Sequence, residues 1–288
     1  MFYFKILCEI FKNLFYLFKL NKILNFNSNP DMSNDLNTDY IQRFYKHYQF
    51  INLFKSNLPN NKQSFFEIGP GGSLSNFYTA KYLGFNEYYA YDGIKHNVFG
   101  SYSKNLYQLI KKKFNFEIEP TKDLYFYKSL ENLNNLKFNF IYSWGVLEHV
   151  DDLDKLFKFL RDTSEKNALH LHVVDTHPHG WSNFKDPYSI FKISKFIWKL
   201  MYSERYFINR FRESFYKNLL KKYNFEEIKF NVVEINKFIK SNYKNETLIN
   251  EIDDKSLLSE KSSFLNEFKK LGDEDILKRR FILLFKKI

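Results

Sequence analysis

A glycine-rich turn is the first feature of the sequence whose residue types and spacing could do chemistry. The apolar run Ser64–Ile68 leads into Gly69-Pro70-Gly71-Gly72-Ser73, and a helical pattern follows as far as Leu83. Glycine permits positive φ and lets a ligand approach the backbone, because it has no Cβ. Amides at the start of the following helix would face a polar or anionic ligand. Leu74 replaces the third glycine of a dinucleotide fingerprint and no Gly-Lys-Ser/Thr follows, which excludes that motif and a P-loop.

Carboxylates accompany this turn. Glu67 precedes it, and Asp92 ends a second apolar run at residues 88–91. A carboxylate at the end of a second parallel strand can accept hydrogen bonds from both hydroxyls of a ribose. The alternative is that Asp92 only caps the next turn.

Histidines form the third group, since five of the seven lie between His149 and His179. His170 and His172 are two residues apart on an expected strand and face the same side. Asp175, His177 and His179 follow at its carboxyl end, where open α/β sheets bind ligands. A histidine here could act as a general base, with Asp175 fixing its tautomer, because its ordinary pKa of ~6.5 is near operating pH. A structural role and a zinc site are the alternatives, and we assign no metal because the spacing is not diagnostic.

Alternating strands and helices must position these groups. Apolar runs at residues 64–68, 88–91, 138–143 and 168–174 are expected strands, with helical spacing at residues 146–160. This alternation favours a parallel, doubly wound sheet. Further along, the pattern predicts helices at residues 189–202 and 213–223, strands at 227–233 and 280–285, and loop with short helix at 240–274.

Length and composition exclude several classes of protein. The chain has 288 residues, of which 44% are apolar, so general disorder is excluded. The single cysteine, Cys8, excludes a disulfide framework and fits a cytoplasmic location. The formal charge of +11 comes from dispersed lysines rather than from a dense basic patch, so we do not expect nucleic acid as a partner.

The N-terminal residues 1–24 form an expected amphipathic helix. Lys5, Glu9, Lys12, Tyr16 and Lys19 fall on one stripe of a helix whose remaining side chains are mostly Phe, Leu and Ile. The charges exclude a transmembrane span, and their placement excludes a signal peptide. The helix either packs on its own domain or lies in a membrane interface with its lysines toward the lipid head groups. Residues 25–39 then form a linker, which gives an N-terminal segment 1–39 and a main domain 40–288.

The most specific segment is Ser143-Trp144-Gly145-Val146-Leu147-Glu148-His149-Val150. It resembles the s-x-x-v-L-E-H-v segment that follows strand four in class I S-adenosylmethionine-dependent methyltransferases. Glu67, Gly69 and Gly71, with Ser73 in the third glycine position, resemble motif I of that family. The ordered matches span residues 64 to 175. The resemblance implies a Rossmann-like seven-stranded α/β sheet of order 3-2-1-4-5-7-6 with the last strand antiparallel.

The resemblance also implies roles for individual residues, with S-adenosyl-L-methionine as the cofactor. Glu67 would contact the amino group of its methionine part, and Asp92 would hold the ribose. The expected cofactor-binding residues are Glu67, Gly69, Gly71, Ser73, Asp92, Glu131, Ser143 and Trp144. The expected catalytic residues are His149, Asp175, His177, His179 and Arg212.

Asn209-Arg210-Phe211-Arg212-Glu213-Ser214 resembles an Asn-Arg-x-Arg-x-Ser run of bacterial methyltransferases from surface-polysaccharide clusters. These arginines could clamp an anionic acceptor or pair with Asp186 or Glu213 as structure. We expect residues 176–223 to form a helical lid over the acceptor site.

The predicted function is methylation of a small molecule or glycan, at oxygen and with a histidine base. The protein would be cytoplasmic, with peripheral contact to the inner face of the membrane through residues 1–24 as an open alternative. An RNA or protein methyltransferase and a non-catalytic membrane-associated scaffold are the alternative functions. No Asn-Pro-Pro-Tyr-like tetrapeptide follows the fourth strand, which disfavours amino methylation of nucleic acid.

Overall fold

The computed structural model describes most of the chain. The described residues are 2–18, 36–71, 74–93, 108, 110–112, 115, 124–177, 187–202, 208–243 and 247–288. The expected linker 25–39 lies outside them up to residue 35, and helix α3 (Leu36–Asn52) begins inside the remainder of it. Among these residues, no helix is both long and apolar enough to cross a membrane.

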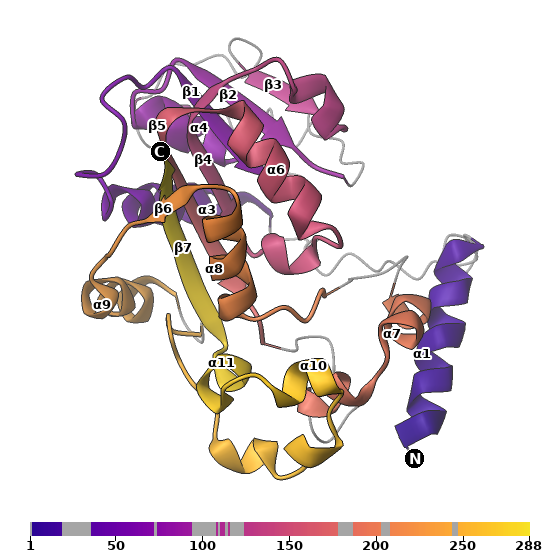
Figure 1. The fold of residues 1–288 in the computed structure, drawn as a ribbon. Helices are drawn as coiled ribbons and strands as arrows, with labels where there is room; N and C mark the ends of the chain where they lie inside the picture. Colours follow the sequence, from indigo (N-terminus) through magenta and orange to yellow (C-terminus); the bar gives the residue numbers. More distant parts are fainter. Residues whose placement is uncertain are drawn as a thin grey trace.

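A seven-stranded sheet organises the molecule (Figure 1). Its strands are β1 (Ser64–Ile68), β2 (Glu87–Tyr91), β3 (Leu124–Tyr127), β4 (Phe138–Trp144), β5 (Ser164–Asp175), β6 (Phe225–Glu227) and β7 (Arg280–Lys287). They are ordered β3-β2-β1-β4-β5-β7-β6. The first five are parallel neighbours, and β7 runs antiparallel to β5 and β6. The predicted fold class and strand order are therefore confirmed.

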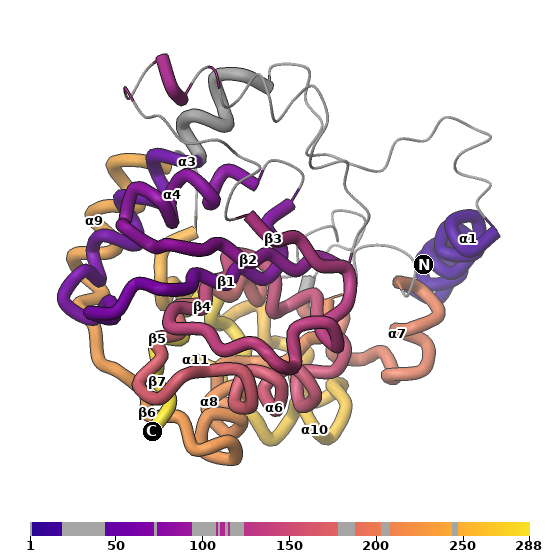
Figure 2. Tube along the Cα trace, turned by 90° about the horizontal axis from the view of Figure 1, so that it is seen from above, coloured from indigo at the N-terminus to yellow at the C-terminus, as the bar shows by residue number. Residues whose placement is uncertain are grey.

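Helices cover both faces of the sheet, as Figure 2 shows from above. On one face lie α3, α4 (Asn76–Tyr82) and α9 (Val232–Asn242), whose buried side chains join one core cluster. On the other lie α6 (Leu153–Thr163) and α8 (Glu213–Lys222), which form a second cluster. Helix α8 was expected to belong to the lid insertion 176–223, but it packs against β6 and covers the sheet.

A third core cluster lies apart from the sheet. It joins α1 (Phe2–Leu17), η3 (Pro187–Lys192) and α7 (Lys195–Tyr202) to the short C-terminal helices. Those are η4 (Lys255–Leu258), η5 (Lys261–Ser263), α10 (Asn266–Lys269) and α11 (Asp273–Leu277). The expectation of loop and short helix there is confirmed.

Two predicted elements were wrong because local caps start new helices. The strand expected at residues 227–233 ends at Glu227, since the side chain of Asn231 accepts hydrogen bonds from the amides of Val233 and Glu234 and begins α9. The helix expected at residues 146–160 is divided into η2 (Leu147–His149) and α6, because Asp152 caps α6 by accepting from the amide of Lys155.

Candidate functional site

The carboxyl ends of β1, β2, β4 and β5 bring the predicted site residues to one edge of the sheet. Because these strands are parallel and in register, the glycine turn, Asp92, the segment after Trp144 and the segment after Asp175 all leave the sheet there. Ser73 and His179 lie outside the described residues. The glycine turn, Asp92 and the two segments after β4 and β5 therefore lie at the carboxyl edge of the parallel strands, where they were expected.

The two glycines of the turn are needed for different reasons. Gly69 has φ +70°, and a Cβ there would lie 2.4 Å from a methyl carbon of Val146, so β1 and the loop after β4 touch at this point. Gly71 has φ +65°, and a Cβ there would meet no atom of the described residues within 4 Å. The backbone at Gly71 therefore borders space that none of those residues fills. A cofactor could approach the turn closely there, which fits the expected place of S-adenosylmethionine.

Glu67 lies beneath the turn and is almost fully buried. Its Oε1 accepts a hydrogen bond of 2.7 Å from Nδ2 of Asn76, and its Oε2 accepts one from the hydroxyl of Tyr88. Burial raises the pKa of Glu67 to about 7, and the nearby charge of Asp92 acts in the same direction, against the two hydrogen bonds. Glu67 thus links β1, β2 and α4. Its contact with the cofactor's amino group stays a prediction.

The other acids of the predicted cofactor site follow β2 and β3. Asp92 is 8% exposed directly after β2, where its amide donates to the carbonyl of Tyr127 at 3.2 Å. Glu131 is exposed in η1 (Leu130–Leu133), where its amide donates to the hydroxyl of Ser129 at 3.2 Å. Both therefore lie at the same edge as the glycine turn, and Asp92 is placed where a ribose could be held.

Ser143 and Trp144 end β4 in different environments. Ser143 is fully buried, and its hydroxyl is 2.7 Å from Nδ1 of His172, so its side chain is engaged within the sheet layer. Trp144 is partly buried against Phe50 of α3 and stacks on Tyr243, with ring centroids 5.5 Å apart. Binding of the cofactor by either residue stays a prediction.

The paired histidines of β5 are buried within the sheet. His170 and His172 are fully buried, and His170 Nε2 lies 2.8 Å from the hydroxyl of Ser164. Burial lowers the pKa of His172 to about 3 and lowers the pKa of His170 strongly, so both are neutral at operating pH. Within the described part of the chain, no group of three or more His, Cys, Asp and Glu side chains could hold a metal ion.

Two histidines remain at the carboxyl edge. His149 is half-buried at the end of η2, and the side chain of His177 is 30% exposed after β5. Nε2 of His177 is 4.0 Å from Oδ2 of Asp253, which also accepts from the hydroxyl of Tyr188. The carboxylate beside the His177 ring is therefore Asp253.

Asp175 was expected to fix the tautomer of a catalytic histidine; its carboxylate is hydrogen-bonded to a backbone amide and to Arg280, and that role stays a prediction. Oδ1 of Asp175 accepts from the backbone amide of His177 at 2.9 Å, and Oδ2 accepts from Nη2 of Arg280 at 2.9 Å. The short aspartate side chain closes on the amide two residues ahead, as is common where a strand turns into a loop. Asp175 thus shapes the backbone that carries His177.

Arg212 is a buried residue of the fold. Its Nη1 donates to the carbonyl of Thr176, and its guanidinium lies 4.7 Å from the ring centroid of Phe191. Burial lowers its pKa to about 10. Glu213, one suggested partner, instead pairs with Lys217 and Lys278, and Asp186 lies outside the described residues. Arg212 therefore joins the end of β5 to η3, and its contact with an acceptor stays a prediction.

His47 and Glu148 were not predicted as site residues, although both lie near the carboxyl end of β4. His47 of α3 places Nδ1 2.6 Å from the hydroxyl of Tyr142 and its ring 5.3 Å from that of Trp144. The signal for α3 was the helical spacing of Phe44, His47 and Ile51. Burial raises the pKa of Glu148 to about 8, and the charge of Asp175 adds to the effect.

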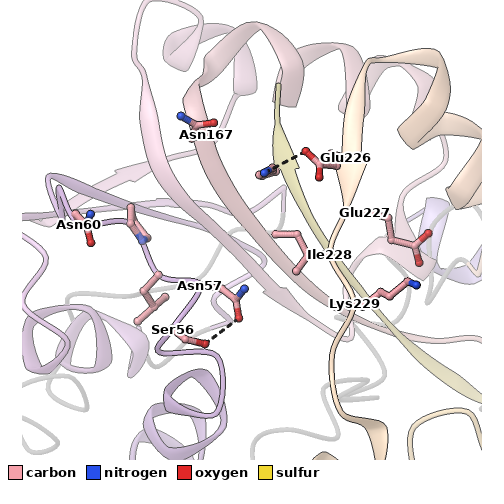
Figure 3. A pocket seen from close by; sticks show the side chains of 11 residues that line it. Ser56, Asn57, Asn60, Asn167, Glu226, Glu227, Ile228 and Lys229 are labelled. Carbon is pink, nitrogen blue, oxygen red and sulfur yellow. Dashed lines mark hydrogen bonds and ion pairs between the residues drawn. The ribbon is translucent and has the colours of Figure 1, made fainter.

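A surface hollow of about 680 Å³ lies elsewhere (Figure 3). It is bordered by the segment before β1 and by the ends of β6 and β7, with Asn57, Asn167 and Glu226 among its lining residues. Asn167 lies in the register shift between the first pair of β4 and β5, Phe138 with Ser164, and the next, Phe140 with Leu169, so this hollow is at the amino end of the parallel strands. It does not belong to the site at the carboxyl edge.

Comparison with known proteins agrees with this arrangement. The family described as "Methyltransferase domain" matches residues 40–229. No curated protein matches the sequence.

Solved structures resemble the chain at low identity. A protein of Listeria monocytogenes assigned to the S-adenosylmethionine-dependent methyltransferases is 13% identical, with 84% of this chain and 99% of that chain covered and a TM-score of 0.46. An S-adenosylmethionine-dependent methyltransferase of Mesorhizobium loti is 12% identical, with coverages of 83% and 98% and a TM-score of 0.42. A phosphoethanolamine N-methyltransferase of Haemonchus contortus is 13% identical, with coverages of 88% and 59% and a TM-score of 0.45.

Proposed function

This chain belongs to the methyltransferase-domain family, and we propose that it methylates a hydroxyl oxygen of a small molecule or glycan. It is an S-adenosylmethionine-dependent enzyme. That cofactor supplies a methyl group on a positively charged sulfur, which leaves as a thioether when the acceptor oxygen bonds to the methyl carbon. We place the reaction in the cytoplasm, as the single thiol suggests.

The observation that carries the proposal is the position of His149 and His177. Both are partly exposed histidines that follow β4 and β5 at the edge holding Gly71 and Asp92. A neutral imidazole there can take the proton of a hydroxyl as its oxygen forms the new bond. Once the ring of His177 has taken the proton, its Nε2 would be within ion-pair distance of Oδ2 of Asp253, at 4.0 Å.

The other residues of the edge support binding and alignment. Gly71 leaves room beside the turn, and Asp92 is placed to accept the ribose hydroxyls. The described part of the expected lid, η3 and α7, is held by Arg210, whose Nη1 donates to the carbonyls of Ile190 and Ile193. A lid held in this way would exclude water from the acceptor.

The acceptor class can be tested with labelled cofactor. Purified full chain is incubated with methyl-labelled S-adenosylmethionine and, separately, with nucleotide sugars, simple glycosides, phenols, total RNA and a lysine-containing peptide. We expect label on a sugar or phenol hydroxyl. Label confined to RNA or peptide would replace this proposal with the other enzyme class. Tight cofactor binding without transfer to any acceptor would favour a scaffold.

The base is tested with the acceptor that this assay identifies. We expect His177→Ala to lower the single-turnover rate ~10²–10⁴-fold with nearly unchanged cofactor affinity, because a general base acts only in transfer. The wild-type rate should rise with pH through the imidazole range, and the variant should lose that rise. His149→Ala and His179→Ala are measured in parallel. Near-wild-type rates in all three variants would remove the histidine base from the mechanism.

A further inference from the structure

Helix α1 directs most of its aromatic side chains away from the protein, while Phe2, Ile6 and Ile10 pack toward it. Tyr3, Phe4 and Phe11 are 80%, 69% and 62% exposed, whereas Glu9 and Asn13 are buried. Helices on the surface of a water-soluble domain usually have the opposite arrangement, with the apolar stripe toward the core. The exposed aromatic side of α1 therefore needs an explanation beyond the folding of this chain.

Contacts with α7 fix this orientation. Ile6 joins the third core cluster, and the hydroxyl of Tyr202 donates to Oε2 of Glu9 at 3.2 Å. The other oxygen of Glu9 accepts from Nζ of Lys12 at 2.7 Å. Figures 1 and 2 both show α1 alongside α7 at a distance from the sheet. The polar side of α1 is thus anchored to the protein, which leaves the apolar side outward.

We propose that this apolar side adsorbs to the surface of an anionic phospholipid bilayer. The face consists of Tyr3, Phe4, Leu7, Phe11, Phe15 and Phe18, which lie on one side of the helix at helical spacing. Aromatic and leucine side chains on one side of a helix are suited to the boundary between head groups and acyl chains. The helix would lie in the plane of that boundary.

Charge favours a bilayer over a second copy of the chain. Residues 1–24 contain four lysines and one glutamate, and the whole chain carries +11. Lys12 pairs with Glu9, so the net positive charge of residues 1–24 comes from the other three lysines, and this charge is attracted to lipid phosphates. In a symmetric pair of α1 helices the same lysines would face like charges. Anionic lipid satisfies both the apolar side and the lysines.

Vesicle sedimentation of the full chain tests this proposal. Vesicles of phosphatidylcholine mixed with phosphatidylglycerol are compared with vesicles of phosphatidylcholine alone, at low and high salt. We expect binding to the anionic vesicles that weakens with salt. Phe4→Ser combined with Phe11→Ser should weaken it by about tenfold or more, because two exposed aromatic rings no longer enter the bilayer.

The matched control replaces two exposed apolar residues that are not part of α1, by combining Val233→Ser with Ile252→Ser. It should bind vesicles like the wild type, and both double variants should keep the wild-type thermal transition and cofactor affinity. Equal binding by the Phe4 and Phe11 variant and the wild type would overturn the proposal, as would no binding to anionic vesicles. A wild-type dimer that these substitutions dissociate, without vesicle binding, would assign the face to a second copy instead.

Discussion

Two buried glutamates border the edge at which the predicted cofactor and acceptor sites meet. The sequence pattern predicted the place of Glu67 at the end of β1, but not its partners. Asn76 and Tyr88 reach it from α4 and β2, and such contacts between elements leave no local pattern in the sequence. Glu148 was read only as part of a motif. Its side chain is buried, and its backbone carbonyl accepts a hydrogen bond from the backbone amide of Asn209 at 2.8 Å, a contact between distant parts of the sequence.

The raised pKa of Glu148 predicts an unusual dependence of stability on pH. Its pKa is about 8 in the folded protein, against ~4.3 for an ordinary glutamate. Between these values the folded protein holds the proton more tightly than the unfolded chain. The contribution of Glu148 to the free energy of unfolding therefore falls as pH rises through this range.

Glu148→Gln removes this titration, so its free energy of unfolding should fall less than that of the wild type from about pH 5 to about pH 8. Urea unfolding at several pH values measures the difference. Glu131→Gln, at an exposed position, serves as the control and should follow the wild type. Parallel curves for Glu148→Gln and the wild type would show that this carboxyl is ionised in the fold.

At the scale of elements, Gly69 and Gly71 offer a matched pair. Both have similar positive φ, so an alanine costs about the same backbone strain, ~1 kcal/mol, at either position. Only Gly69→Ala adds a clash with Val146, which overpacking data place at about 1–3 kcal/mol. Gly69→Ala should therefore have the lower thermal transition.

Gly71→Ala should instead weaken S-adenosylmethionine binding by about tenfold or more, since its Cβ enters space that the cofactor needs. Calorimetric titration and thermal unfolding of both variants separate the two effects. Unchanged affinity in a folded Gly71→Ala protein would place the cofactor away from this glycine.

Elements with a strong local signal could be predicted, and those defined by packing could not. All five residues of β1 are buried, three of them large and apolar, and its observed bounds are the predicted ones. Strand β6 has only three residues and is defined by its pairing with β7. The apolar pattern of residues 227–233 therefore predicted a strand in the wrong place. Helix α3 was not assigned, although it brings His47 to Tyr142.

At the scale of the whole molecule, the strand order and the common edge of the parallel strands could be predicted. The order was implied by the resemblance of residues 64–175 to the methyltransferase family, and the common edge follows from the parallel direction of the strands. The third core cluster could not be predicted, because it joins α1 to α7 and α10 from distant parts of the sequence. The orientation of α1 follows from that cluster. The sequence left open whether the N-terminal helix packs on its own domain or lies in a membrane interface. In the structure, α1 packs on the protein with the side that carries Glu9 and Asn13.

The central claim is that S-adenosylmethionine binds at the carboxyl edge of the parallel strands. Isothermal titration of the full chain with S-adenosylmethionine tests it, with Asp92→Ala as the site variant and Asp154→Ala, whose side chain pairs with Lys222 on the surface, as the control. We predict binding by the wild type and the control, and an affinity at least about tenfold lower for Asp92→Ala, because the ribose loses a charged acceptor. No heat of binding from folded wild-type protein at millimolar cofactor, or an unchanged affinity in Asp92→Ala, would contradict the account.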